Sequence, residues 1–197
     1  MENAMIRISV AGKEHASLIA DLSRRTFYDT FAPYNTRENM DQFMNVQFTR
    51  EQLIAEVGTP RNTFLLAWME DQPNQPNLPA GDAHPQPVGY AHPQPVGYAR
   101  LYESGDLPRE LSGSPAIEIS RFYSEKHTIG KGVGKALMES CLQLAREKGM
   151  EWIWLCVWEQ NLRAIRFYEK MGFEKFDEHI FILGQDLQHD WKMKRRL

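Results

Sequence analysis

The chain opens with two patterns of apolar residues, one with the period of a strand and one with the period of a helix. Residues 6–10 alternate apolar and polar side chains, as a half-buried strand does, and Gly12 follows them. Between Lys13 and Pro33 the apolar residues keep to one helical face, and they are Leu18, Ile19, Leu22, Phe27 and Phe31. The pattern predicts a strand and then an amphipathic helix that ends at Pro33.

Capping residues predict two further short helices after Pro33. Thr36 stands before a polar run that favours a helix, and Thr49 is followed three residues later by Gln52, which is the spacing of a capping box. Residues 63–69 are then mostly apolar and lead into a stretch rich in Pro, Asn and Gln. This order predicts two helices, a strand and a loop.

A tandem repeat lies inside this Pro-rich stretch, which we expect to form a mobile loop over about residues 70–95. Residues 83–90 and 91–98 have the same sequence, and only the second copy runs directly into the next apolar segment. We therefore expect a strand over residues 96–103. The first copy is then an insertion that a long loop tolerates at little cost in closure entropy.

The second half of the chain alternates strands with amphipathic helices. Residues 115–124 predict a central strand that forms a hairpin with the strand before it. Residues 152–157 are apolar on both faces, as in a parallel strand that is covered on both sides. The helix between these strands has an apolar stripe of Leu137, Met138, Cys141, Leu142 and Ala145. Residues 173–183 and 190–196 predict a closing hairpin, so the sheet is mixed.

Length and composition favour one globular domain over residues 1–197. The chain has no apolar run near the roughly 18 residues of a membrane span and no signal peptide, so we expect a cytoplasmic protein without membrane attachment. A net charge of −3 argues against nucleic acid as a partner. Cys141 and Cys156 are expected to be buried thiols. His84 and His92 of the repeat lack partners at ligand spacing, so we expect no metal site.

A glycine-rich loop between the central strand and the following helix is the first candidate site. Gly130, Gly132 and Gly134 alternate with other residues, so backbone N–H groups can converge on an anion at the start of a helix. The loop does not match a nucleotide-triphosphate loop, because Ala136 follows Lys135 where Ser or Thr is required. It does not match the dinucleotide fingerprint either, whose third glycine would fall at Lys135.

Two motifs of this sequence, in the same order, resemble those of the GNAT N-acetyltransferases. The loop resembles the acyl-CoA pyrophosphate motif Gln/Arg-x-x-Gly-x-Gly/Ala, with Ile129 where Gln or Arg is expected. The second motif, Asn-x-x-Ala-x-x-x-Tyr-x-x-x-Gly-Phe, is matched at every fixed position from Asn161 through Tyr168 to Gly172. Asn161 is a good helix N-cap, and Tyr168 lies seven residues later on nearly the same side of the helix.

The resemblance implies the GNAT acyl-CoA N-acyltransferase fold, an α/β (α+β mixed sheet) architecture with a central mixed sheet of about seven strands flanked by helices. It implies acetyl-CoA as co-substrate, with the thioester arm in a gap where the central strand parts from its parallel neighbour. The residues that it assigns to acetyl-CoA are Phe122, Tyr123, Ser124, Ile129, Gly130, Lys131, Gly132, Val133, Gly134, Lys135, Asn161 and Tyr168.

Acetyl transfer to an amine needs a neutral amine, a donor to the oxyanion and a proton for the departing thiolate. The resemblance makes Tyr168 the general acid that protonates the thiolate. Glu118 alternates with Ser120 and Phe122 on one face of the central strand. The resemblance makes a carboxylate at this position the candidate general base, which deprotonates the amine through water. A charged residue on an exposed strand face is the alternative interpretation of Glu118.

Segments near both ends of the chain also resemble bacterial spermidine/spermine acetyltransferases of the PaiA type. They include residues 26–31, 35–36, 38–40 and 48–49, and Phe181, Leu183, Gly184, Gln188, Asp190 and Met193. The N-terminal segment would form one wall of an acceptor pocket, and the acceptor would be a small amine such as a polyamine. A protein or peptide N-terminal amine, another small amine, and a non-catalytic acyl-CoA-binding module are the alternatives. The oligomeric state stays open, with a homodimer among the options.

Overall fold

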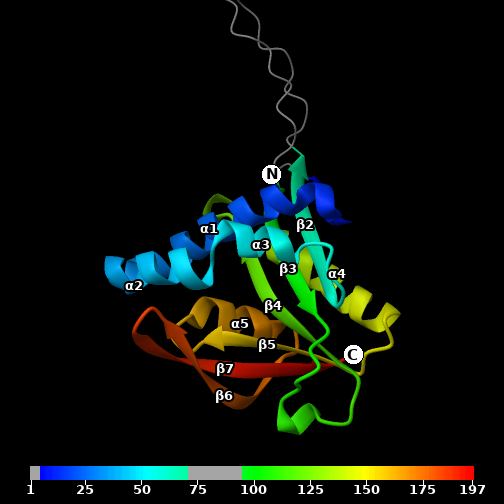
Figure 1. The fold of residues 1–197 in the computed structure, drawn as a ribbon. Coiled ribbons are helices and arrows are strands. Elements are labelled where there is room, and N and C mark those ends of the chain that lie inside the picture. The colour runs from blue at the N-terminus through cyan, green and yellow to red at the C-terminus, as the bar shows by residue number, and fades with distance from the viewer. Residues whose placement is uncertain (1–4, 71–94) are drawn as a thin grey trace, which may run out of the picture.

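The sheet of this protein has seven strands, and all but one pair of neighbours run antiparallel (Figure 1). The computed structural model describes residues 5–70 and 95–197. The strand order is β1-β2-β3-β4-β5-β7-β6, and only β4 and β5 are parallel. The strands are β1 (Met5–Val10), β2 (Asn62–Glu70), β3 (Pro95–Tyr102), β4 (Ala116–Ser124), β5 (Trp152–Trp158), β6 (Glu174–Leu183) and β7 (Asp186–Arg196). This architecture confirms the expected mixed sheet.

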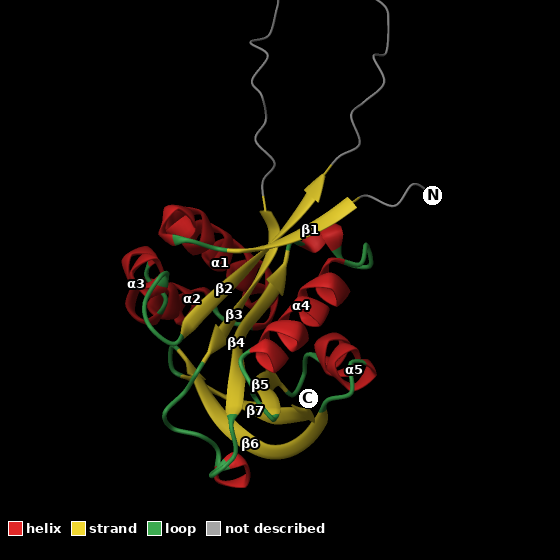
Figure 2. Ribbon diagram, turned by 90° about the vertical axis from the view of Figure 1, so that its right-hand side faces the viewer, coloured by secondary structure: helices red, strands yellow, loops and turns green. Residues whose placement is uncertain are grey.

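Helices cover both faces of the sheet (Figure 2). They are α1 (Ala16–Phe31), α2 (Arg37–Gln42), α3 (Arg50–Glu56), α4 (Val133–Glu147) and α5 (Leu162–Lys170). On one face Ile19 and Leu22 of α1 pack against Phe64 and Leu66 of β2. On the other face the predicted stripe of α4, which includes Leu137, is buried against β3, β4 and β5. No helix in residues 5–70 and 95–197 is long and apolar enough to cross a membrane.

The predicted helix ends are present. The side chain of Thr36 accepts a hydrogen bond from Asn39 N–H, and Thr49 and Gln52 form the reciprocal capping box at the start of α3. Asn161 caps α5, where its Oδ1 accepts from Ala164 N–H at 3.2 Å. These caps satisfy backbone N–H groups that have no partner within a helix, which is why the sequence could reveal them.

The closing hairpin differs from its prediction at one end. Its second strand begins at Asp186, four residues before the expected start at residue 190. The turn uses Gly184, which has φ +64° and would place a Cβ 2.7 Å from the backbone of Asn39. Asn39 Oδ1 accepts a hydrogen bond from Gln185 N–H at 3.1 Å. This contact with α2, distant in sequence, fixes a turn that the local pattern does not show.

The tandem repeat is described only in part. The second copy enters β3 at Pro95, and Val96, Tyr98 and Ala99 are buried, which confirms the strand predicted there. The first copy, with His84, lies outside the described residues, as does His92. The expected loop lies there too, except for its two ends.

Candidate active site

The two parallel strands separate halfway along their length. β4 pairs with β5 only from Ala116 to Ile119, opposite Trp152 to Leu155. Beyond this point β4 continues to pair with β3, and β5 continues to pair with β7. Residues 120–124 of β4 therefore have no strand partner on their β5 side within the described chain. A cavity of about 780 Å³ occupies this separation, as the expected gap requires.

A β-bulge at Ser120 changes which side chains of β4 share a face. Arg121 pairs with Arg100 and Ile119 pairs with Leu101, so Ser120 is an extra residue on β4. Phe122 contacts Phe167 and Tyr168 on the α5 side, whereas Glu118 lies with Arg100 and Arg121 on the α3 side. The expectation that Glu118 and Phe122 share one strand face is wrong, because the bulge shifts the alternation by one residue. All three residues 118, 120 and 122 still line the cavity.

The glycine loop presents unpaired backbone N–H groups at the start of α4. Gly130 and Gly132 have φ of +83° and +91°, a left-handed conformation that favours glycine. The N–H groups of residues 130 and 132–135 make no hydrogen bond within the described chain. Such a set of N–H groups at a helix N-terminus fits a phosphate or pyrophosphate. Ile129, Gly130, Gly132, Gly134 and Lys135 line the cavity, whereas Lys131 and the buried Val133 do not.

Asn161 and Tyr168 of α5 both line the same cavity, as their spacing predicts. The Oδ1 atom of Asn161 is committed to the helix cap, so its amide N–H₂ is the group that can bind a ligand. Tyr168 is 6% exposed and contacts the rings of Phe122 and Phe173. Burial raises the pKa of Tyr168 well above its usual value, so the phenol carries its proton at neutral pH.

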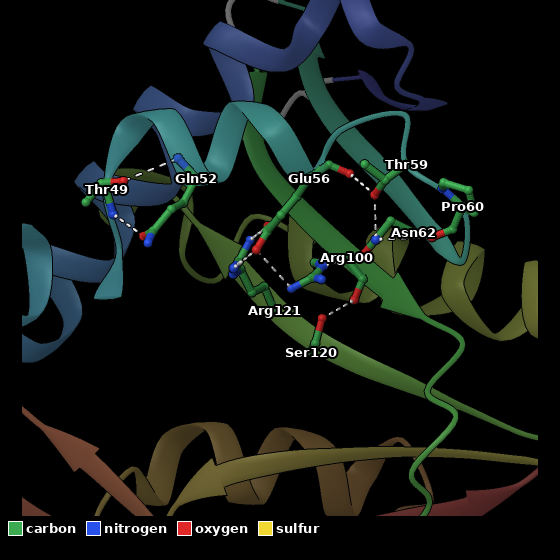
Figure 3. Close-up of polar contacts among 9 residues, drawn as sticks. All are labelled: Thr49, Gln52, Glu56, Thr59, Pro60, Asn62, Arg100, Ser120 and Arg121. Carbon is green, nitrogen blue, oxygen red and sulfur yellow. Dashed lines mark hydrogen bonds and ion pairs between the residues drawn. The ribbon is translucent and has the colours of Figure 1, made fainter. Parts of the chain in front are cut away.

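The charges of Arg100 and Arg121 act on Glu118, and Figure 3 shows the contacts of these two arginines with Glu56. Glu56 of α3 forms an ion pair with Arg121, and its Oε1 lies 3.5 Å from Nη1 of Arg100. Arg100 also donates from Nε to Asn62 Oδ1 at 2.6 Å. Burial raises the pKa of Glu118, while the charges of Arg100 and Arg121 act to lower it. Glu118 is thus a half-buried carboxylate in the wall of the cavity, and two cations lie near it.

Removal of the Glu56 carboxylate is expected to destabilise the fold. Glu56→Gln leaves Arg100 and Arg121 partly buried without their shared counter-ion, and we expect the free energy of unfolding to fall by about 2 kcal/mol. Urea unfolding followed by circular dichroism measures this loss. Glu51→Gln, an exposed position on the same helix, is the matched control and should change stability little. Equal stability of the two variants would show that the cluster is not a structural contact.

The structure adds cavity residues that periodicity did not identify, from β5, β6 and β7. They are Trp158, His179, Gln188 and Asp190, with Arg100 of β3. Burial, and then the charge of Glu159, raise the pKa of Asp190 to about 6. Gln188 and Asp190 did belong to the C-terminal segment that carries the family resemblance. Their placement beside the cavity depends on strand pairing, which the sequence does not give.

The N-terminal helices form an aromatic wall opposite these strands. The rings that line the cavity are Phe27, Phe31, Phe43 and Phe48. The ring centroids of Phe27 and Phe43 are 4.7 Å apart. This placement agrees with the pocket wall expected for residues 26–31.

The two cysteines differ in their exposure. Cys141 is buried, as expected, but Cys156 is only half-buried and lines the cavity, so the expectation of two buried thiols is wrong for Cys156. Burial raises the pKa of both thiols to about 12, which keeps them protonated and unreactive at neutral pH. Among the described residues no group of three His, Cys, Asp or Glu side chains could hold a metal ion.

Comparison with known proteins gives one consistent family. The model of the "Acetyltransferase (GNAT) family" matches residues 42–173. An uncharacterised N-acetyltransferase in the pepI 3′ region of Lactobacillus delbrueckii subsp. lactis is 32% identical over 194 residues, which cover 96% of each chain.

A solved structure, and a relative that matches only part of this chain, are also N-acetyltransferases. The PaiA N-acetyltransferase from Thermoplasma acidophilum, crystallised in complex with coenzyme A, superposes with a TM-score of 0.68 at 19% identity and covers 98% of this chain and 99% of that one. A probable spermine N(1)-acetyltransferase from Bacillus subtilis subsp. natto is 37% identical over 59 residues, which are 29% of this chain and 39% of that protein.

Proposed function

The chain belongs to the GNAT family of acetyltransferases and is an acetyl-CoA-dependent N-acetyltransferase, and from this premise we propose that its acceptor is a cationic polyamine such as spermidine or spermine. The observation that carries the proposal is the wall of the cavity made by the sheet, where Glu118 and Asp190 place carboxylates. The net charge of −3 and the partial similarity to a spermine acetyltransferase support it. The proposal locates the reaction in the cytoplasm.

In the proposed arrangement, acetyl-CoA binds along the split between β4 and β5. The free N–H groups of residues 130 and 132–135 receive the pyrophosphate, and the unpaired edge of Phe122, Tyr123 and Ser124 pairs with the amides of the thioester arm as an added strand would. The side-chain N–H₂ of Asn161 donates to the same arm from the start of α5. Lys135 adds a positive charge at the mouth of the loop.

The reaction is a direct attack of the amine on the thioester. Glu118, through a water molecule, accepts the proton that the ammonium group must lose before it can attack. The nitrogen then forms a bond to the carbonyl carbon, and a main-chain N–H of β4 stabilises the oxyanion. When the C–S bond breaks, Tyr168 gives its proton to the thiolate, the nitrogen loses its second proton to solvent, and Tyr168 regains a proton from solvent. Overall, the ammonium group and acetyl-CoA give the amide, the free thiol and one proton released to solvent.

The acceptor is tested by release of free thiol from acetyl-CoA with a panel of amines. Spermidine and spermine should be turned over with the highest kcat/KM, ahead of amino acids, aminoglycosides and peptides with a free N-terminus. Turnover of peptide N-termini without turnover of polyamines would overturn the proposal.

Salt should weaken the reaction with polyamines. Exposed charges more than about 8–10 Å apart are screened at physiological ionic strength, so the attraction between spermine and an acidic enzyme weakens as salt is added. We expect kcat/KM for spermine to fall several-fold between low and high salt, measured as initial rates in increasing sodium chloride. An acceptor amine that is uncharged at the pH of the assay serves as the control. An equal fall in kcat/KM for both acceptors would mean that salt acts on acetyl-CoA binding instead.

A further inference from the structure

Asp190 is a half-buried carboxylate without a cationic partner. It lies on β7, opposite Trp158 of β5 and His179 of β6, and it lines the cavity. Within the described chain its side chain makes no hydrogen bond and no ion pair. After burial, the negative charge of Glu159 is the group that raises its pKa. A carboxylate in this setting is costly to bury unless a cation joins it.

The other acid that lines the cavity already has cations beside it. Glu118 has Arg100 and Arg121, and Glu56 pairs with the same two arginines. Asp177, on the neighbouring strand, accepts a hydrogen bond from Lys192 at 2.7 Å. Asp190 is thus the cavity carboxylate that has no cation beside it within the described chain.

The basic groups near Asp190 do not supply that counter-ion. Lys192 is committed to Asp177. Partial burial and the charge of Lys192 lower the pKa of His179 below its usual value, so the imidazole is neutral at pH 7. Asp190 itself is mostly ionised at this pH, because its pKa is about 6.

Gln188 provides a second acceptor two residues away on the same strand. Its Nε2 donates to Asn35 Oδ1 at 2.8 Å and to Asp186 Oδ2 at 3.0 Å. Because a carboxylate accepts hydrogen bonds and does not donate them, this fixes the orientation of the amide. The Oε1 atom of Gln188 is then buried and has no hydrogen-bond partner within the described chain. The residue is 95% buried, and it lines the cavity. A buried acceptor without a donor is as costly as a lost hydrogen bond.

Aromatic rings complete a site for an organic cation. Trp158, opposite Asp190, lies 5.2 Å from the ring of Tyr34 and 6.1 Å from that of Phe31, measured between ring centroids. Such rings stabilise cations on their faces and also contact the methylene groups between nitrogens.

This site lies well away from Glu118. Glu118 is opposite Trp154, and Asp190 is opposite Trp158, four residues further along β5. At about 3.3 Å per residue, the two positions are roughly 13 Å apart along the strand. Cys156 lies between them and is uncharged.

We propose, as an extension of the polyamine acceptor proposed above, that Asp190 and Oε1 of Gln188 bind the cationic nitrogen of the acceptor that does not react. The nitrogen that reacts is held near Glu118, where the split between β4 and β5 begins. Asp190 is then the specificity-determining residue that favours diamines and polyamines over monoamines, and it takes no part in proton transfer.

The test compares Asp190→Asn with the parent enzyme on spermidine and on butylamine, which has a single nitrogen. For spermidine we expect KM to rise at least about tenfold, which corresponds to about 1.4 kcal/mol, with little change in kcat. For butylamine and for acetyl-CoA we expect the kinetic constants to stay within about twofold, because neither uses the lost charge. Asp190→Glu keeps the charge and should retain most of the preference for spermidine.

Glu178→Gln is the matched control. It removes the same charge at an exposed position on β6 that pairs with Lys175 and does not line the cavity, so its kinetics should equal those of the parent. Asp190→Asn should melt no lower than the parent at pH 7, because it removes a poorly compensated carboxylate.

Three results would overturn the assignment. If Asp190→Asn behaves like Glu178→Gln on spermidine, Asp190 has no role in recognition. If it lowers kcat equally for spermidine and butylamine, Asp190 acts in proton transfer. If the parent enzyme turns over butylamine or peptides but no polyamine, the polyamine proposal itself fails and the role of Asp190 fails with it.

Discussion

Tyr168→Phe is expected to lower kcat about 10²-fold or more, with little change in the affinity for acetyl-CoA. Tyr168 lines the cavity, and the substitution keeps the ring, which is buried against Phe122 and Phe173, and removes only the hydroxyl. The departing thiolate then has no side chain to protonate it. Steady-state kinetics of thiol release give kcat, and calorimetry gives the dissociation constant of CoA.

Tyr102→Phe is the control for this substitution. Tyr102 is half-buried on β3 and does not line the cavity, so the loss of its hydroxyl should leave kcat unchanged. If Tyr168→Phe retains full activity, Tyr168 is a packing residue of α5 and another group or water protonates the thiolate. If Tyr168→Phe loses activity only because part of the protein is unfolded, Tyr168 is likewise a packing residue.

Gly132→Val is expected to weaken CoA binding by about 10²-fold or more, because it removes at least two hydrogen bonds from backbone N–H groups to the charged pyrophosphate. Gly132 has φ +91°, a conformation that a β-branched residue rarely adopts. The protein itself leaves room for a side chain here, since the nearest atom to an added Cβ is Ile6 Cδ1 at 3.5 Å. The added side chain is thus expected to clash with the ligand. It also disfavours the positive φ that the loop has when it binds the ligand.

Gly149→Val separates strain from ligand binding. Gly149 follows the other end of α4, also has a positive φ of +72°, and has no atom near an added Cβ. It does not line the cavity, so this variant should carry a similar backbone strain and bind CoA with unchanged affinity in calorimetry. Equal CoA affinity of the two variants, with both folded, would remove the glycine loop from the CoA site.

Local patterns in the sequence predicted much of the fold because local interactions produce them. Thr49 and Gln52 form a capping box within one helical turn, and the apolar period of α4 marks the face, including Leu137, that the sheet buries. Glycines at 130 and 132 allow the left-handed conformation that the loop adopts there. These features depend on residues close together in the chain.

The features that could not be predicted depend on pairing between distant segments. The bulge at Ser120 is set by the register of β3 against β4, and it reverses the alternation from which Glu118 was assigned to the face of Phe122. The start of β7 depends on a contact of Gly184 with Asn39 of α2. Asp190 reaches the cavity because β7 lies beside β5, whereas a sequence places it only in a closing hairpin.

The most direct test of this account is a crystal structure of the protein with CoA and spermine. We expect pyrophosphate density within hydrogen-bonding distance of the N–H groups of residues 130 and 132–135, and the pantetheine arm between β4 and β5 alongside Phe122 to Ser124. One spermine nitrogen should lie at Asp190 and Gln188, with a terminal nitrogen near Glu118. Density for CoA outside the split between β4 and β5, or for spermine away from the cavity, would contradict the account.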